Sequence, residues 1–146
     1  MRNQIYELET AQSFATYEFV SKGPKGHIRK LVKYTELGNA GIFNLGFGDK
    51  LGDSDDFDDK VISDNKDSLK VLATAVATIY QFTDKFPYAS IFATGSTLAR
   101  TRLYRIGISN ALEEIEKDFN ILGFFDGQWE TFEKNKDYSA FSITRK

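Results

Sequence analysis

Apolar and polar residues alternate along the first third of the chain, and this alternation predicts three antiparallel strands. The first strand covers residues 14–21, and the glycines and proline of residues 22–26 then form a hairpin turn. A second turn, GNAG, separates the next two strands. Their apolar positions are Ile28, Val32 and Tyr34 in one strand and Phe43, Leu45 and Phe47 in the other. The third strand has small or polar residues between its apolar ones, so we expect only one of its faces to be buried.

The middle of the chain changes from a polar loop to the clearest helix in the sequence. Residues 49–66 form an acidic, glycine-punctuated loop that we expect to be flexible. Over residues 67–86, apolar residues recur at spacings of three and four, which is typical of an amphipathic helix. We expect Asp64 or Asn65 to cap the start of this helix and Pro87 to follow its end.

Shorter elements follow this helix. The apolar run over residues 88–94 predicts a buried strand. A helix then begins at Ser96 or Thr97 and ends near Gly107. A further helix starts at Asn110, because a glutamate follows it three residues later, as in a capping box. The sequence therefore predicts two separate helices in this region.

The last quarter of the chain predicts a hairpin and a final strand. The segments NILGFF and QWETFE flank the dipeptide Asp126-Gly127, which suits a type I′ turn, and YSAFSITRK supplies the last strand. Together these elements predict one α+β domain over residues 1–146, in the order β-β-β-α-β-α-α-β-β-β. We expect a mostly antiparallel sheet packed against one long helix and one or two shorter helices.

Composition narrows the chemistry that this domain can perform. With 146 residues, of which 41% are hydrophobic and 27% charged, the chain can bury a core and is not of the disordered class. No apolar run approaches the roughly 20 residues that span a bilayer, so we expect no membrane partner. The absence of cysteine removes disulfides and thiolate metal sites, and the single histidine, His27, excludes a multi-histidine site. The first ten residues lack the apolar stretch of a secretory signal, so the expected location is the cytoplasm.

The charge distribution is less even than the net charge of −2 suggests. Residues 49–67 contain eight Asp against three Lys, which leaves about +3 on the rest of the chain. The closely spaced aspartates resemble a calcium loop, but a loop counted from Asp53 has Asp58 and Asp64 where an EF-hand needs glycine and glutamate. We therefore expect a solvated acidic loop and neither a metal nor another cofactor.

The segment over residues 91–107 is the strongest candidate for a binding site. A predicted strand, a Gly-Ser-Thr turn and a helix start are followed by arginines near the positive end of the helix dipole, where cations are unfavourable. Backbone N–H groups, two hydroxyls and an arginine fork can together bind a phosphate or a carboxylate. The candidate anion-binding residues are Ser96, Thr97, Arg100, Arg102 and Tyr104. A simpler interpretation also fits, in which Ser96 or Thr97 only caps the helix and the arginines form salt bridges.

The first predicted hairpin is a weaker candidate for binding nucleic acid. Its basic residues are Lys22, Lys25, Arg29, Lys30 and Lys33, and the nearby rings are Tyr17, Phe19 and Tyr34. Sheets with basic strands and exposed rings bind single-stranded nucleic acids through phosphate contacts and base stacking. Charged edge strands also prevent sheets from pairing with one another, and that role needs no ligand.

Several segments, read in order, resemble a family of small uncharacterised bacterial proteins. They are GPKGHIRKLVKY, FNLGFGD, KVLATAVATIYQF, IFATGSTLARTRLYRIGI and GFFDGQWETFEKNKDYSAF. The resemblance covers nearly all of the chain from Phe14 onward and implies a single cytoplasmic bacterial domain of unknown function. It implies no activity and no catalytic residue.

These observations lead to one main hypothesis and two alternatives. The main hypothesis is a non-enzymatic binding or regulatory protein that engages a phosphate-bearing partner, such as single-stranded nucleic acid, through Arg100, Arg102 and the basic hairpin. The first alternative is an enzyme on nucleic acid or a phosphorylated small molecule, such as a toxin-like ribonuclease, with Tyr104 or a loop aspartate assisting proton transfer. The second is a protein-interaction module, such as an antitoxin or a subunit of a homo-oligomer.

Overall fold

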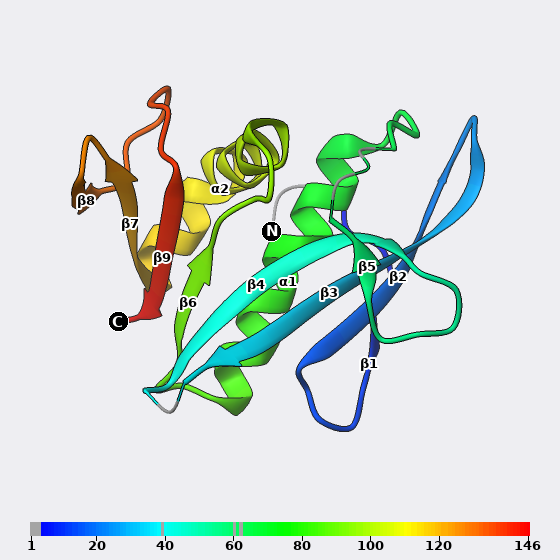
Figure 1. Ribbon diagram of the computed structural model, residues 1–146, viewed down its shortest axis with the longest axis horizontal. Helices are drawn as coiled ribbons and strands as arrows, with labels where there is room; N and C mark the ends of the chain where they lie inside the picture. Colours follow the sequence, from blue (N-terminus) through cyan, green and yellow to red (C-terminus); the bar gives the residue numbers. More distant parts are fainter. Residues whose placement is uncertain (1–3, 39, 60, 62) are drawn as a thin grey trace.

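A single mixed sheet with two helices organises the chain, which confirms the predicted α+β class (Figure 1). The computed structural model describes residues 4–38, 40–59, 61 and 63–146. The strands within these residues are β1 (Glu9–Thr10), β2 (Thr16–Gly23), β3 (Gly26–Leu37), β4 (Ile42–Lys50), β5 (Phe57–Asp58), β6 (Ser90–Ala93), β7 (Phe119–Phe125), β8 (Gln128–Thr131) and β9 (Ala140–Arg145). The helices are α1 (Ser68–Lys85) and α2 (Leu98–Asp118).

Antiparallel hairpins make up most of the sheet, whose strand order is β1-β2-β3-β4-β6-β9-β7-β8, with β5 beside β4. The predicted meander of β2, β3 and β4 is confirmed. The predicted hairpin of β7 and β8 is also confirmed, and Asp126 and Gly127 both have the positive φ, 52° and 77°, that a type I′ turn requires. The one parallel pairing of the described strands was not predicted: β4 and β6 are parallel, joined by the crossover that contains α1.

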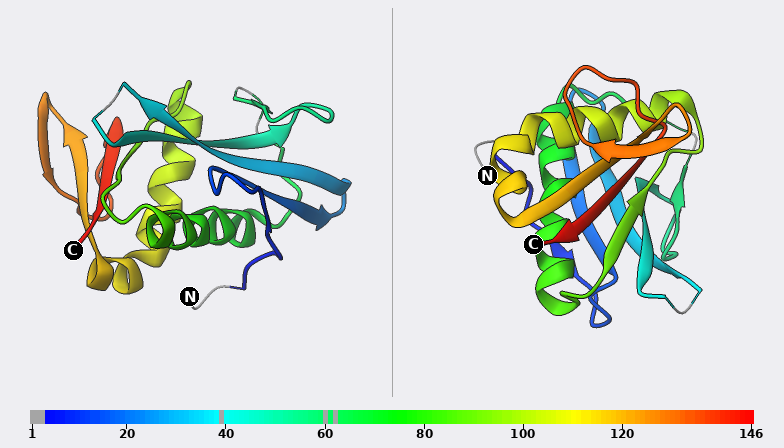
Figure 2. Two further views of the ribbon diagram at one scale, coloured as in Figure 1. Left: turned by 90° about the horizontal axis from the view of Figure 1, so that it is seen from below. Right: turned by 90° about the vertical axis from the view of Figure 1, so that its left-hand side faces the viewer.

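Both helices lie on the same face of the sheet, and the core fills the space between the two layers (Figure 2). Alternation in β2 sends Tyr17 and Phe19 into this core, where they are at most 3% exposed. Tyr34 of β3 stacks on Phe82 of α1, with ring centroids 4.0 Å apart. The helix pattern of α1 and the strand patterns thus bury their apolar residues against each other.

The prediction of two helices after β6 is wrong, because α2 continues through Gly107 and Asn110 for 21 residues. Gly107 is buried where α2 crosses α1, and a Cβ at this position would lie 3.5–3.8 Å from Leu72 and Val76. Packing against α1 supports the helix where its intrinsic propensity is weak. The fold therefore has two long helices, not one long helix and shorter ones, and the two-residue strands β1 and β5 were also missed.

The predicted N-cap of α1, Asp64 or Asn65, is wrong, whereas Pro87 follows the end of the helix as predicted. Asp67 occupies the N-cap position without a side-chain capping bond. Asn65 is 2% exposed and connects the loop to the first hairpin through two hydrogen bonds. Its side chain accepts a bond from the Lys25 N–H (2.7 Å) and donates one to the Gly26 carbonyl (2.9 Å). The Asp67 carboxylate instead accepts bonds from the hydroxyls of Tyr6 and Ser21, both at 2.5 Å.

The described part of the acidic loop thus contacts the body of the protein at several points, while Lys60 and Ile62 lie outside the described residues. Among the described helices, neither has the length and apolar character needed to cross a membrane.

Candidate functional site

The five predicted anion-site residues lie at the start of α2, but they face two different sides. Arg100 and Tyr104 point inward and are 3% and 8% exposed. Ser96, Thr97 and Arg102 line a separate surface hollow. The structure therefore does not bring all five residues together into one cradle.

The two hydroxyl groups at the start of α2 are used within the protein. Thr97 is the N-cap of the helix, and its hydroxyl accepts a bond from the Arg100 N–H at 3.2 Å. The Ser96 hydroxyl donates to the backbone carbonyl of Asp59 at 2.5 Å. The helix-capping interpretation of Thr97 is thus confirmed.

Arg100 extends from the first turn of α2 to β4. β4 pairs with β6 only from Ile42 to Asn44, before the strand reaches Phe47. The Arg100 guanidinium lies over the ring of Phe47 in β4, with Cζ 5.3 Å from the ring centroid.

The hydrogen bonds of the Arg100 guanidinium are incomplete. Nη1 donates to the carbonyl of Val61 at 3.0 Å. Nη2 is buried and has no hydrogen-bond partner within the described part of the chain, and no ion pair of Arg100 is found there. A buried N–H group without a partner costs roughly 1–3 kcal/mol, and more when it carries charge. Arg100 therefore has unused capacity to bind an anion.

Two glycines make room for this arginine, and neither was singled out among the candidate residues of the sequence. A Cβ on Gly48 would lie 3.1 Å from Arg100 Nη2 and 2.4 Å from the Asp58 carbonyl. A Cβ on Gly95 would lie 2.5 Å from Arg100 Cβ and 2.4 Å from the Thr101 nitrogen. Only glycine allows the backbone to come this close at both positions. The glycine that follows the β6 strand and the glycine within β4 are therefore the signals in the sequence that point to a buried side chain here.

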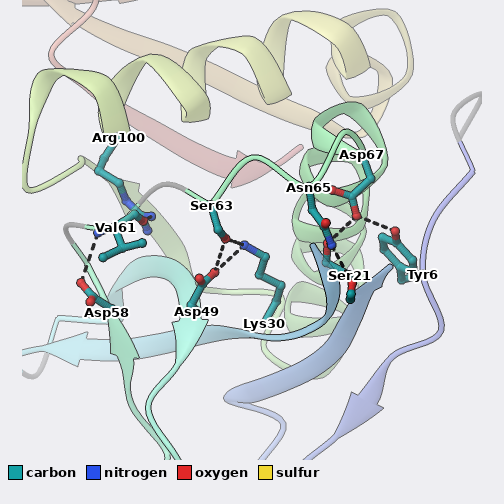
Figure 3. Close-up of polar contacts among 11 residues, drawn as sticks. Tyr6, Ser21, Lys30, Asp49, Asp58, Val61, Ser63, Asn65, Asp67 and Arg100 are labelled. Atoms are coloured by element: carbon teal, nitrogen blue, oxygen red, sulfur yellow. Dashed lines mark hydrogen bonds and ion pairs between the residues drawn. The ribbon is translucent and has the colours of Figure 1, made fainter. Parts of the chain in front are cut away.

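Arg100 lines a cavity of about 260 Å³ between the sheet, the acidic loop and the two helices (Figure 3). Apolar side chains of β4, α1 and α2 form one wall, and Lys30, Ser63, Asp64 and Asp67 add polar groups. The apolar residues of this wall are Phe47, Val71, Leu72 and Leu103. We call this the Arg100 cavity.

Lys30 belongs to this cavity and not to an exposed basic surface. It is 6% exposed, and its Nζ bonds to the Asp49 carboxylate at 2.5 Å and to the Ser63 hydroxyl at 2.8 Å. Ser63 also donates to Asp49 at 2.9 Å. The positive charge of Lys30 is therefore balanced within the protein, which distinguishes it from that of Arg100.

The rest of the basic hairpin lacks the predicted stacking surface. Tyr17, Phe19 and Tyr34 are all core residues. Lys22 and Lys25 are exposed, Lys33 is half-buried, and Arg29 pairs with Asp53 at 3.1 Å. The hairpin therefore presents charge to solvent without those three rings.

The hydroxyl of Tyr104 lies in the same interior region as Arg100. Burial raises the pKa of Tyr104, while the nearby Arg100 charge and a hydrogen bond with the Phe47 backbone act in the opposite direction. Because burial dominates, this phenol remains protonated at neutral pH. It can donate a hydrogen bond but does not act as a base there.

The second hollow, where Arg102 lies, is a less complete site. Its other cation, Arg105, forms an ion pair with Asp137, and Arg102 itself is exposed. Among the described residues, no group of three or more His, Asp or Glu side chains is arranged to hold a metal ion.

The geometry thus defines an α+β fold with a buried arginine that lines a partly open cavity. The chain belongs to a family of unknown function, DUF6934, whose family model matches residues 2–146. The resemblance inferred from the sequence is therefore confirmed at the level of the family. Comparison with curated proteins and with solved structures found no match.

Proposed function

We propose that the protein is a non-enzymatic binding protein that receives the anionic group of a phosphate-bearing partner at Arg100. The observation that carries the proposal is the Nη2 of Arg100, which is buried without a hydrogen-bond partner among the described residues, on a side chain that lines the Arg100 cavity. An oxyanion at this point would supply the missing acceptor and balance the charge.

A second donor lies in the same cavity. The Lys30 ammonium uses two of its three N–H bonds for Asp49 and Ser63, as far as the described residues show. Its remaining N–H bond is available to a second oxygen of the same anion. Binding would therefore combine a charged contact from Arg100 with a weaker one from Lys30.

A larger partner would also meet cations outside the cavity. Arg102, Lys22 and Lys25 are exposed, and a single-stranded nucleic acid would need phosphate contacts with such cations in addition to Arg100. Such binding would weaken steeply as the salt concentration rises, because each phosphate contact releases counterions.

Calorimetric titration of the wild-type protein and of two matched variants with inorganic phosphate tests this proposal. Arg100→Met removes the inward charge, and Arg102→Met removes one charge from the exposed side of the same helix. We expect Arg100→Met to lose at least tenfold in affinity and Arg102→Met to stay within about threefold of the wild type. Equal losses in both variants, or no phosphate binding by the wild type, would contradict the proposal.

A short RNA in the same titration tests the nucleic-acid form of the proposal. Tighter binding of the RNA than of phosphate, with a strong salt dependence and a loss in both variants, would support a polymeric partner. Cleavage of the RNA by the wild-type protein, lost in Arg100→Met, would instead favour the enzyme.

A further inference from the structure

We infer that the ligand of the Arg100 cavity is a small organic anion with one oxyanion group on an apolar body, and not a polymer strand. This inference rests on the proposed function, since it takes Arg100 as the group that binds the anion. It adds the size, the charge and the hydrophobic character of the ligand.

The size of the cavity limits the size of the ligand. Its volume of about 260 Å³ lies just below the range of roughly 300–1,000 Å³ that is typical of pockets for drug-sized molecules. A molecule of a few functional groups fills such a space, whereas a strand of several nucleotides does not.

The apolar wall sets the second limit. Phe47, Val71, Leu72 and Leu103 face the same space as the Arg100 guanidinium. A ligand that offered only an inorganic anion would leave this wall in contact with water. An aromatic or aliphatic body attached to the anion would cover it, at about 25 cal/mol for each Å² of apolar surface removed from water.

The charges around the cavity set the third limit. Its lining includes two cations, Lys30 and Arg100, and two carboxylates, Asp64 and Asp67. Asp49 already balances Lys30 at 2.5 Å. A ligand with one anionic group can pair with Arg100, but a second anionic group would meet the carboxylates. The cavity therefore disfavours a chain that has phosphates on both sides of each unit.

Val61, Ser63, Asp64 and Asp67 line the cavity, and the contacts made from this part of the chain would hinder a long strand from passing through (Figure 3). The carbonyls of Asp59 and Val61 accept bonds from Ser96 and Arg100. Further along, Ser63 bonds to Lys30, and Asp67 bonds to Tyr6. A strand threaded through this side of the cavity would have to break these contacts, whereas a small molecule held within the cavity would not.

Calorimetric titration with four probes tests the inference: inorganic phosphate, phenyl phosphate, benzoate and a ten-nucleotide oligouridylate. We expect phenyl phosphate or benzoate to bind at least tenfold more tightly than inorganic phosphate, because the ring covers the apolar wall. The comparison of phenyl phosphate with benzoate shows whether the oxyanion is a phosphate or a carboxylate.

Two tryptophan variants of α2 show where the ring binds. Leu103→Trp fills the cavity and should remove the tenfold advantage of the ring. Leu98→Trp changes a residue of the same helix that is 91% exposed and should leave the advantage intact. Circular dichroism confirms that both variants are folded. If Leu103→Trp does not fold, Leu103→Ala serves instead. It should weaken the binding of phenyl phosphate and benzoate, because the ring loses an apolar contact, and leave the affinity for inorganic phosphate unchanged.

The outcomes separate this inference from the proposed function. Equal, Arg100-dependent binding of phenyl phosphate and inorganic phosphate would overturn the inference and leave the proposed function standing, and so would tighter binding of the oligouridylate than of every small probe. Binding of benzoate alone would support the small organic anion and overturn the phosphate-bearing partner. Binding of none of the four probes would overturn both.

Discussion

Two arginines, Arg100 and Arg145, both pack on aromatic rings but differ in how completely their guanidinium groups are hydrogen-bonded. Both guanidinium groups lie over aromatic rings, at 5.3 Å from Phe47 for Arg100 and at 5.0 Å from Phe119 for Arg145. Arg145 donates from Nε to the Thr83 hydroxyl at 2.8 Å, and its Nη2 donates to the Tyr80 carbonyl and to Asp84. Nη1 of Arg100 donates to the Val61 carbonyl at 3.0 Å, and its Nη2 has no partner among the described residues.

The difference shows what each arginine does for the protein. Arg145 connects the last strand to α1 through neutral acceptors and a carboxylate, so its charge is used for stability. Arg100 is the more deeply buried of the two, but part of its guanidinium is not bonded within the described structure. A buried cation that is not paired lowers stability unless something else binds it, so Arg100 should lose less stability than Arg145 on the same substitution.

The largest expected effect comes from Gly95→Ala, which would displace Arg100 from its position over Phe47. The new Cβ would meet the Thr101 nitrogen at 2.4 Å and Arg100 Cβ at 2.5 Å, so the start of α2 would have to move. We expect a loss of at least ~3 kcal/mol in the free energy of unfolding, measured by urea denaturation. A loss below ~1 kcal/mol would show that α2 does not need this close approach.

The second prediction compares Arg145→Met with Arg100→Met directly. We expect Arg145→Met to cost about 1–3 kcal/mol, since it removes the donors to Thr83, Tyr80 and Asp84. Arg100→Met should cost at least ~1 kcal/mol less, because it also removes an unpaired buried charge. Urea denaturation without added anions measures both values. Equal costs would mean that the charge of Arg100 is satisfied within the protein.

A third prediction uses the phenol of Tyr80, which lies beside Arg145. Burial, followed by the hydrogen bond from Tyr80 to Asp118, raises the pKa of Tyr80 to about 12. In the unfolded chain this group loses its proton near pH 10, so between pH 10 and 12 only the unfolded state is ionised there. Stability should therefore fall as pH rises through this window. Tyr80→Phe should make the fall less steep, as measured by denaturation at several pH values. An unchanged slope would contradict this assignment.

The smallest expected effect is a gain in stability from Gly107→Ala. The position is helical, and a new methyl group would make ordinary contacts with Leu72 and Val76 at 3.5–3.8 Å. We expect the variant to be stabilised by about 0.5–1 kcal/mol in urea denaturation. Because the Arg100 cavity does not include Gly107, anion binding should stay unchanged. This variant therefore separates changes in stability from changes in binding.

Local patterns predicted the hairpins and α1, because their signals lie within a few residues of one another. The alternation in β2 and the Asp126-Gly127 turn are examples that the structure confirms. The continuity of α2 could not be predicted in this way. Gly107 stops a helix on its own propensity, and only its packing on α1, more than thirty residues earlier in the chain, reverses that preference.

The candidate site was predicted in part. The sequence singled out Arg100 through its place at the start of a helix, and the structure places it in a cavity. Local pattern assigns Lys30 to the exposed hairpin, since its partners Asp49 and Ser63 come from a strand and a loop far along the chain. The parallel pairing of β4 and β6 was not predicted either.

Because that parallel pairing is short, the sheet is held together more weakly between β4 and β6 than within its antiparallel parts. Only three residue pairs join β4 to β6, so two blocks of antiparallel strands meet at a narrow junction beside Arg100. A small rotation of one block about this junction would change the space around the guanidinium. By linkage, a molecule that binds one separation of the two strands more tightly also favours the corresponding angle between the blocks. If the blocks rotate in this way, occupancy of the cavity and the angle between the blocks are coupled.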